Sequence, residues 1–270
     1  MDIVETVRTE LGAAPEVFSI GKSELGKDIL CAHCGGHGGK QIIMTAGIHA
    51  RECYTALVVL RQVREFKRRG ADGAYFVPLV NPDGALFFES GDAQNSDVLE
   101  AFAADSRVWK ANALGVDLNC NFDANWGTGA QNKRRLGASD YIGEYPFGAA
   151  ESRALKEFTE RIKPSATVSY HCMGGELYWE FFQRGAARMR DEAFAAAVAE
   201  RIDVVKVDGH LDSAGGYKDW CVQRLGIPAV TVELIASGSH PFCAADFAAD
   251  AEKNARLPEF ILDLLCEKEL

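Results

Sequence analysis

The sequence alternates between short apolar segments, rich in residues that favour strands, and longer segments with helical periodicity. The strand-like segments are 28–33, 41–47, 74–80, 165–171, 204–207 and 229–234, and the helical ones are 54–69, 149–162, 189–202 and 244–267, the last interrupted by Pro258. Short apolar strands between amphipathic helices are typical of a mostly parallel sheet with helices on both faces. The sequence therefore predicts an α/β protein.

Local signals mark the ends of several segments. Residues 54–69 place apolar side chains on one helical face, and Gly70 then suits the end of a helix. Segment 74–80 runs into NPDG, a turn sequence. Segments 28–33 and 41–47 are separated by the glycine-rich run CGGHGGK, which predicts a β-hairpin.

The long stretch 107–148 is different, because it is rich in Asn, Gly, Asp and aromatic residues and has little periodicity. A segment of this length without regular elements is usually functional. No internal repeat, low-complexity tract or linker interrupts the chain, so residues 1–270 are expected to form a single domain.

Charge and cysteine content exclude some classes of protein. The net charge of −10 leaves no basic surplus to neutralise phosphates, so nucleic acid is not an expected partner. The eight cysteines are spread along the chain and do not predict a disulfide framework. We find neither a signal-peptide pattern nor an apolar run long enough to span a membrane, so a cytoplasmic location without a membrane partner is expected.

Polar residues stand where three predicted strands end. His49 and Glu52 follow one strand at a spacing of three, His171 ends another, and Glu233 ends a third. Ligands bind outside the carboxyl ends of such strands. Two histidines and one glutamate make a catalytic zinc set, and a further glutamate can serve as general base. Taken singly, each residue has an ordinary structural interpretation; together they predict a metal site.

A second cluster competes for this interpretation. Cys31, His33, Cys34 and His37 are crowded like the ligands of a zinc knuckle. No second cluster follows at zinc-finger spacing, and alternate residues of a strand face opposite sides. We therefore favour a strand and a glycine turn for this stretch.

Five motifs, AGIHARE, VNPDG, GVDLNCNF, SYH and TVEL, occur in one order over residues 45–234. In these motifs the chain resembles the zinc carboxypeptidases. The resemblance implies a three-layer α/β/α fold with a central twisted, mixed, mostly parallel sheet, and one Zn²⁺ per chain. It also implies that His49, Glu52 and His171 hold the zinc, that Glu233 is the general base and acid, and that Arg51 contacts substrate or oxyanion.

Three positions depart from the pattern of the common carboxypeptidases. Cys120 stands where they have the arginine that clamps a C-terminal carboxylate, which a thiol cannot do. Lys110 stands where they have the arginine that stabilises the oxyanion of the tetrahedral intermediate. The family's mobile tyrosine aligns near Leu211, with Tyr217 nearby as a substitute. Asn119 is expected to contact substrate.

The stretches WKANALGVDLN, HCMGGELYW and GGYKDW are similar to bacterial γ-D-glutamyl-meso-diaminopimelate peptidases. In this register Lys218 falls in the specificity pocket and suits an anionic group; the alternative is a solvated surface lysine. The basic run 132–137 lines the cleft or is a solvated loop. The predicted function is hydrolysis of an amide bond in small, acidic peptidoglycan peptides.

Three other functions remain open from the sequence. The same four residues, His49, Glu52, His171 and Glu233, could serve a zinc amidohydrolase or deacylase acting on an N-acyl substrate. A general carboxypeptidase with an altered carboxylate clamp is the second, and a non-catalytic binding protein with this fold is the third. The sequence predicts no oligomeric state.

Overall fold

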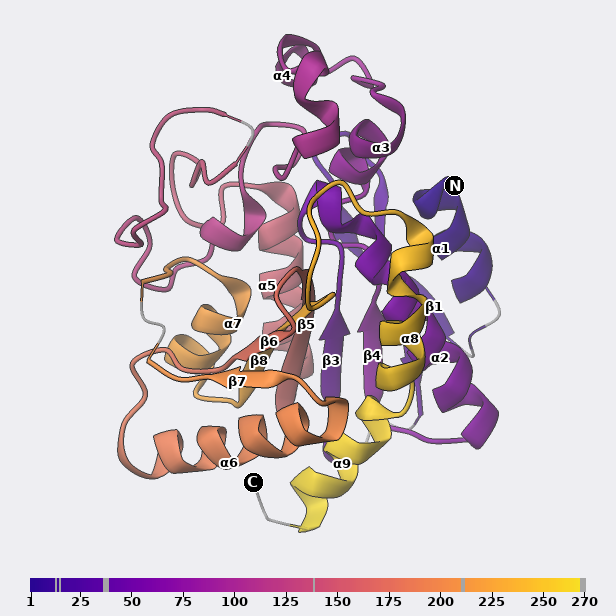
Figure 1. The fold of residues 1–270 in the computed structure, drawn as a ribbon, viewed down its shortest axis with the longest axis vertical. Helices are drawn as coiled ribbons and strands as arrows, with labels where there is room; N and C mark the ends of the chain where they lie inside the picture. The colour runs from indigo at the N-terminus through magenta and orange to yellow at the C-terminus, as the bar shows by residue number, and fades with distance from the viewer. Residues whose placement is uncertain (13, 15, 36–38, 138, 210–211, 268–270) are drawn as a thin grey trace.

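The computed structural model describes residues 1–12, 14, 16–35, 39–137, 139–209 and 212–267. Its strands form one sheet in the order β1-β2-β4-β3-β5-β8-β6-β7 (Figure 1). The strands are β1 (Glu16–Lys22), β2 (Asp28–Cys34), β3 (Ile42–Thr45), β4 (Ala74–Val77), β5 (Ala166–Cys172), β6 (Glu176–Tyr178), β7 (Val205–Val207) and β8 (Ala229–Leu234). The helices are α1 (Ile3–Leu11), α2 (Ala56–Arg69), α3 (Pro82–Ser90), α4 (Asp97–Ala101), α5 (Ala150–Ile162), α6 (Gly185–Ile202), α7 (Tyr217–Trp220), α8 (Ala248–Asn254) and α9 (Leu257–Glu267).

The centre of the sheet is parallel. Strand β3 pairs in parallel with β4 and β5, and β5 pairs in parallel with β8. Antiparallel pairs lie outside this centre, between β1 and β2, β2 and β4, and β6 and β8. The predicted mixed sheet is confirmed, and its parallel strands bring their carboxyl ends to one edge.

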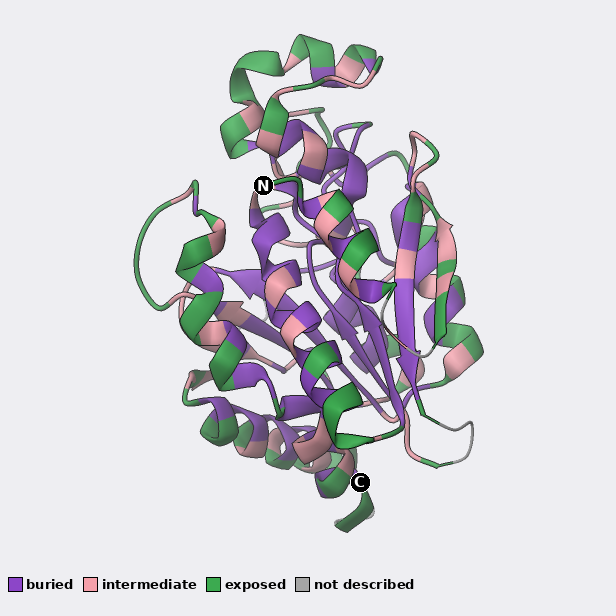
Figure 2. Ribbon diagram, turned by 90° about the vertical axis from the view of Figure 1, so that its right-hand side faces the viewer, coloured by how far each residue is buried: buried purple, intermediate pink, exposed green. Residues whose placement is uncertain are grey.

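Helices cover both faces of the sheet, which confirms the three layers. Ile42 and Met44 of β3 belong to one apolar cluster, together with side chains of α1, α2, α6 and α9. Ile43, between them, belongs to a second cluster with side chains of α5 and α7. This alternation follows from the two-residue period of a strand. Figure 2 shows buried residues along the central strands and exposed ones on the outer sides of the helices.

Capping residues set two helix boundaries near the site. Helix α2 ends at Gly70, which has a φ of 66° and donates its N–H to the last turn, as predicted. The NPDG sequence does more than the turn we expected, because it starts α3. The Asn81 side chain accepts the N–H of Gly84 at 3.0 Å, and Pro82 occupies the first turn.

The predicted hairpin of segments 28–33 and 41–47 is wrong. Strand β4 lies between β2 and β3, and both edges of β3 are occupied by the parallel partners β4 and β5. Strand β2 instead pairs with β1 and β4. Residues 36–38, in the connecting run, lie outside the described residues.

The stretch 107–148 is ordered by side chains rather than by regular elements. Its described residues contain the 3₁₀ turn η3 (Leu118–Cys120) and one isolated bridge. Asn121 donates its amide N–H groups to the carbonyls of Ile142 and Tyr145, at 2.8 and 3.0 Å, and accepts the N–H of Ala149. These contacts tie the end of η3 to the segment that leads into α5.

Candidate metal centre

Two candidate ligands come from the turn that follows β3. Gly47 has a φ of 59°, and a Cβ there would lie 2.6 Å from a methyl group of Leu79, so the tight turn requires glycine. The hydroxyl of Thr55 accepts the Gly47 N–H and donates to the carbonyl of Glu52. His49 precedes, and Glu52 lies within, the 3₁₀ turn η1 (Ala50–Thr55). The sequence thereby fixes both side chains at the sheet edge.

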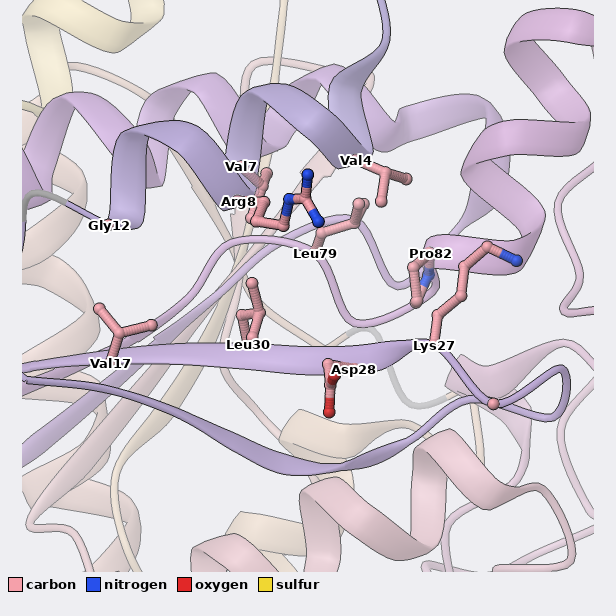
Figure 3. Close-up of a pocket in the computed structure, with 11 residues that line it drawn as sticks. Val4, Val7, Arg8, Gly12, Val17, Lys27, Asp28, Leu30, Leu79 and Pro82 are labelled. Carbon is pink, nitrogen blue, oxygen red and sulfur yellow. The ribbon is translucent and has the colours of Figure 1, made fainter.

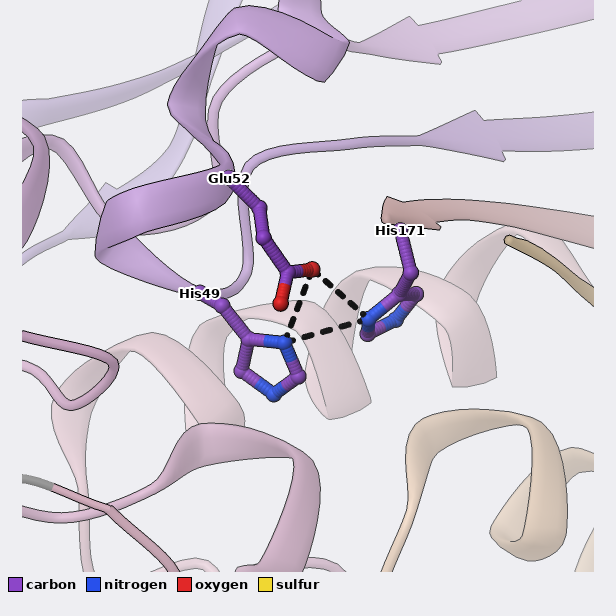
Figure 4. A group of neighbouring side chains, drawn as sticks. All are labelled: His49, Glu52 and His171. Atoms are coloured by element: carbon purple, nitrogen blue, oxygen red, sulfur yellow. Dashed lines mark hydrogen bonds and ion pairs between the residues drawn. The ribbon is translucent and has the colours of Figure 1, made fainter. Parts of the chain in front are cut away.

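His171, near the end of β5, completes a group of three buried side chains that point toward one another (Figure 4). Nδ1 of His49 lies 3.0 Å from Oε2 of Glu52 and 3.2 Å from Nδ1 of His171, which is 3.3 Å from the same carboxylate oxygen. Tetrahedral bonds of about 2.0–2.1 Å to zinc place ligand atoms about 3.3 Å apart. The three donors therefore fit one zinc ion.

Charges in this group depend on one another. Burial disfavours protonated His49, but the carboxylates of Glu52 and Asp117 outweigh it and raise the His49 pKa. Burial likewise raises the pKa of Glu52, yet His49 and His171 outweigh it and hold that pKa well below its ordinary range. A carboxylate kept ionised beside two imidazoles is suited to a cation.

Asp117 is a contact that the sequence interpretation missed. Its Oδ1 lies 3.3 Å from Nε2 of His49, on the side of the ring away from the other ligands, and its Oδ2 lies 2.9 Å from Nζ of Lys110. Burial raises the pKa of Asp117, but Lys110 and His49 outweigh it and hold that pKa well below its ordinary range. A carboxylate behind a histidine ligand orients the ring. Asp117 stands in the motif GVDLN, two positions before Asn119, and this position was the feature of the sequence that could have indicated its role.

Glu233 lies beside the three donors. It is the register partner of His171 on the neighbouring parallel strand, so the two side chains share a face of the sheet. Burial raises the pKa of Glu233 to about 7. A carboxyl group with a pKa near neutrality is suited to exchange protons. Glu233 also lines a cavity of about 220 Å³, with Asn119, Tyr178, Ser213, Gly216, Lys218, Asp219 and Thr231.

Lys218 lies in the same cavity as Glu233. Only 8% of its side chain is exposed, and its Nζ lies 3.0 Å from the carbonyl of Glu180 and 2.6 Å from Oδ1 of Asp219. The alternative of a solvated surface lysine is therefore wrong. The basic run 132–137 is mostly exposed, with Lys133 paired to Asp140.

Lys110, Asn119 and Cys120 meet at a second cavity of about 260 Å³. Asn119 lines both cavities, and its Oδ1 accepts the backbone N–H of Tyr217 at 3.0 Å. Burial raises the pKa of the Cys120 thiol well above its ordinary value, so this side chain stays neutral. Cys120 therefore offers neither a nucleophile nor a positive charge.

Arg51 and Tyr217 differ in their relation to the site. Arg51 follows the candidate ligand His49 by two positions, and its Nε is buried without a hydrogen-bond partner among the described residues. Tyr217 has its side chain in the apolar cluster on the α5 side of the sheet, and its hydroxyl lies 2.8 Å from that of Thr159. The structure thus holds the Tyr217 phenol in the core, away from both cavities.

The competing cysteine cluster does not come together. Cys31 and Cys34 belong to the apolar clusters on opposite faces of the sheet. His33 lies 2.8 Å from a carboxylate oxygen of Glu16, and His37 lies outside the described residues. In the described part of the chain, His49, Glu52 and His171 form the one group of three or more such side chains placed to share a metal ion.

A further cavity, of about 430 Å³, lies between α1 and β2 (Figure 3). Its lining is mainly apolar, and none of the predicted site residues takes part in it. It is therefore separate from the candidate metal centre. Within the described residues, no helix is both apolar enough and long enough to traverse a bilayer.

Comparison with known proteins identifies a family and several relatives of this chain. The family model for zinc carboxypeptidases matches residues 2–256. The chain is 30% identical over 242 residues to murein peptide amidase A of Escherichia coli K12, covering 84% of this chain and 85% of that protein. It is 29% identical over 237 residues to γ-D-glutamyl-L-diamino acid endopeptidase 1 of Lysinibacillus sphaericus, covering 78% of this chain but 58% of that protein.

Solved structures share the fold. Carboxypeptidase A from Helicoverpa armigera superposes with a TM-score of 0.75 at 18% identity, over 96% of this chain and 70% of that one. Murein-tripeptide amidase from Escherichia coli O157 gives a TM-score of 0.63 at 22% identity, over 93% and 94% of the two chains. With the family model matched over nearly the whole length, the chain belongs to the zinc carboxypeptidase family, whose cofactor is zinc.

Proposed function

We propose that this protein is a zinc peptidase that hydrolyses the amide bond between γ-D-glutamate and a diamino acid in small peptidoglycan peptides. His49, Glu52 and His171 hold the metal, and Glu233 exchanges protons with the reactants. The observation that carries the proposal is the convergence of three buried donor atoms within 3.3 Å of one another, beside the register partner of His171.

Each group has a distinct part in this mechanism. Bound zinc supplies a Lewis acid that polarises the scissile carbonyl and makes a water more acidic. Glu233 takes the proton of the attacking water and returns it to the leaving amine. Lys110 and Arg51 place positive charge near the oxygen that becomes negative. Asp117 holds the His49 ring, and Lys110 in turn is paired with Asp117 at 2.9 Å.

The substrate proposal draws on charge and on the relatives. Cys120 leaves the second cavity without the guanidinium that would clamp an ordinary C-terminal carboxylate. Lys218 places a cation in the cavity of Glu233 instead. Two relatives are named for action on a murein peptide and on a γ-D-glutamyl-diamino acid bond. These features favour an acidic, non-standard peptide over an ordinary one.

The test compares two kinds of substrate on zinc-loaded protein. One is the stem tripeptide L-Ala-γ-D-Glu-meso-diaminopimelate, and the other is an ordinary peptide of similar length; products are identified by mass spectrometry. We expect cleavage of the γ-D-glutamyl bond, and its loss in the Glu233→Gln variant. Cleavage of the ordinary peptide alone would point to a general carboxypeptidase. Turnover of neither substrate by zinc-bound protein would overturn the proposal.

A further inference from the structure

Asp140 lies between two lysine side chains. Its Oδ1 is 3.4 Å from Nζ of Lys110, and its Oδ2 is 2.9 Å from Nζ of Lys133. Asp140 stands outside the motifs in which the chain resembles the zinc carboxypeptidases. We propose that Asp140 is a positioning residue, which holds the ammonium group of Lys110 where the reaction needs it. This inference rests on the proposed function, in which Lys110 places positive charge near the oxygen that becomes negative.

The backbone of Lys110 is fixed, but its side chain needs further contacts. The Lys110 carbonyl accepts the N–H of Ala50, and the Trp109 carbonyl accepts the N–H of Arg51, so this backbone lies against η1. A lysine side chain is a flexible stem that ends in a point charge, whereas an arginine side chain ends in a rigid, planar fork. A lysine at this position therefore depends on its partners to keep the ammonium group in one place.

Two carboxylates supply those contacts. Nζ of Lys110 lies 2.9 Å from Oδ2 of Asp117 and 3.4 Å from Oδ1 of Asp140. An ammonium group carries three protons, and in the described part of the structure no third oxygen contacts this Nζ. One proton therefore remains for an oxyanion in the cavity that Lys110 and Asp140 both line.

Asp140 is itself fixed relative to Asp117. The Asp140 N–H is donated to Oδ2 of Asp117 at 3.1 Å, and the Asp117 N–H is donated to the carbonyl of Tyr141 at 2.8 Å. Asp140 has a φ of 65°, a left-handed conformation that is uncommon for residues other than glycine. Residues held in sparsely populated conformations cluster at functional sites. The backbone thus places the Asp140 carboxylate beside Lys110.

The charges around Lys110 balance one another. Burial raises the pKa of Asp140, but Lys133 and Lys110 outweigh it and hold that pKa below its ordinary value, so the carboxylate is ionised at neutral pH. The two lysines then offset the charges of Asp140 and Asp117. Lys133, from the basic run 132–137, thereby allows a second carboxylate to hold Lys110 without adding net negative charge beside the oxyanion.

Removal of the Asp140 charge separates positioning from electrostatics alone. A negative charge near an oxyanion opposes its formation, so an Asp140 that acted only through its charge would slow the reaction, and its loss would raise kcat. An Asp140 that positions Lys110 gives the opposite result, a lower kcat. Asparagine is a suitable replacement, because it also tolerates the left-handed backbone conformation.

The experiment measures kcat and KM on the stem tripeptide for zinc-bound parent, Asp140→Asn, Lys110→Met and the double variant. We expect kcat to fall about 10²–10³-fold in Lys110→Met, as for the loss of an oxyanion donor. In Asp140→Asn we expect kcat to fall about tenfold, with KM within about threefold of the parent value. In the Lys110→Met background, Asp140→Asn should lower kcat by less than about twofold, because no ammonium group remains to be positioned.

The matched control is Asp123→Asn. Asp123 is another aspartate of the stretch 107–148, it is paired with Arg224 at 2.9 Å, and it lines neither cavity of the site. Its variant should keep the parent kcat within about twofold. A kcat of Asp140→Asn at or above the parent value, or an equal loss in both backgrounds, would overturn the inference and leave the proposed function intact. An undiminished kcat in Lys110→Met would instead overturn the part that the proposed function gives to Lys110.

Chemical labelling tests the contact between Asp140 and Lys110 without zinc and without turnover. Acetic anhydride acylates uncharged amines, and mass spectrometry measures the rate at each lysine. Loss of a carboxylate partner lowers the pKa of an ammonium group, so Lys110 should be acylated at least about threefold faster in Asp140→Asn than in the parent. Lys253, which is paired with Asp203, should react at the same rate in both proteins. An unchanged rate at Lys110 would overturn the inference, and failure of the parent to hydrolyse the tripeptide would overturn the proposed function.

Discussion

His171 and Glu233 stand side by side on β5 and β8, in register, so that a candidate metal ligand and a carboxyl group with a pKa of about 7 project from one face of the sheet. Parallel pairing repeats the same spacing along both strands, which makes this distance a property of the sheet rather than of a loop. The arrangement separates two tasks, metal binding and proton transfer, between neighbouring strands.

This separation predicts the phenotype of Glu233→Gln. We expect kcat to fall by about 10²–10⁴-fold, because a positioned proton carrier contributes about that much to a rate. Zinc content should stay at the parent level, since the glutamine side chain of the variant leaves His49, Glu52 and His171 in place. Kinetics together with metal analysis of the purified protein check both parts. Glu176→Gln, a change at the register partner of Glu233 on β6, serves as control and should retain kcat within about tenfold.

Asp117→Asn should weaken zinc binding rather than abolish it. Asp117 faces Nε2 of His49 at 3.3 Å, and loss of such an orienting carboxylate typically costs about 10–100-fold in metal affinity. Competition with a chelating dye measures the dissociation constant. Asp140→Asn is the matched control, because Asp140 lies 3.4 Å from Nζ of Lys110 and makes no described contact with His49. Equal affinities for the parent and Asp117→Asn would contradict this role.

Removal of the metal should lower stability as well as activity. A ligand at about 1,000 times its dissociation constant stabilises the folded state by about 4 kcal/mol if it binds only that state. Urea unfolding of the chelator-treated protein, with and without added zinc, checks this value. The His49→Ala variant removes one of the three donors and should lose most of the zinc-dependent gain. An undiminished gain in that variant would place the metal elsewhere.

Glu151 should make stability depend on pH. It is fully buried, and burial raises its pKa to about 7 despite hydrogen bonds from Asn112 and the Glu24 backbone. The folded state therefore holds a proton that the unfolded state releases near pH 4.5, so this residue's contribution falls as pH rises from about 4.5 to 7. The loss amounts to about 3 kcal/mol.

The measurement compares unfolding free energies of the parent and Glu151→Gln at several pH values. The parent's stability relative to the variant should decline between about pH 4.5 and 8 and then level off. Because glutamine does not titrate, other groups cancel in the difference. A difference that stays constant over this range would show that Glu151 is ionised in the folded protein throughout.

Much of the fold could be predicted because its signals are local. The apolar face of α2 and the glycine that ends it are readable within one window of sequence. Strand pairing is not local, and the hairpin prediction failed because β4, from a later part of the chain, inserts between β2 and β3. A glycine-rich run can join two strands that pair with each other or two strands that have a third strand between them.

The candidate site shows the same division. His49, Glu52 and His171 could be selected because each follows or ends a predicted strand, and the motif order then identified the family. Asp117 stands in one of these motifs, but its role could not be assigned from the sequence, because it arises from contacts with His49 and Lys110 that only the folded chain supplies. Tyr217 was selected as the nearest tyrosine in the sequence, but its phenol is buried against Thr159.

The positions of the candidate ligands in the sequence determine when, during synthesis of the chain, the metal site can form. His49 and His171 are separated by 122 positions in the chain. His171 lies near the end of β5, and β5 pairs with β3 in the sheet. A ribosome must therefore complete well over half of the polypeptide before the three donors can meet. Zinc therefore cannot bind all three donors during the earlier part of synthesis, before β5 has been made.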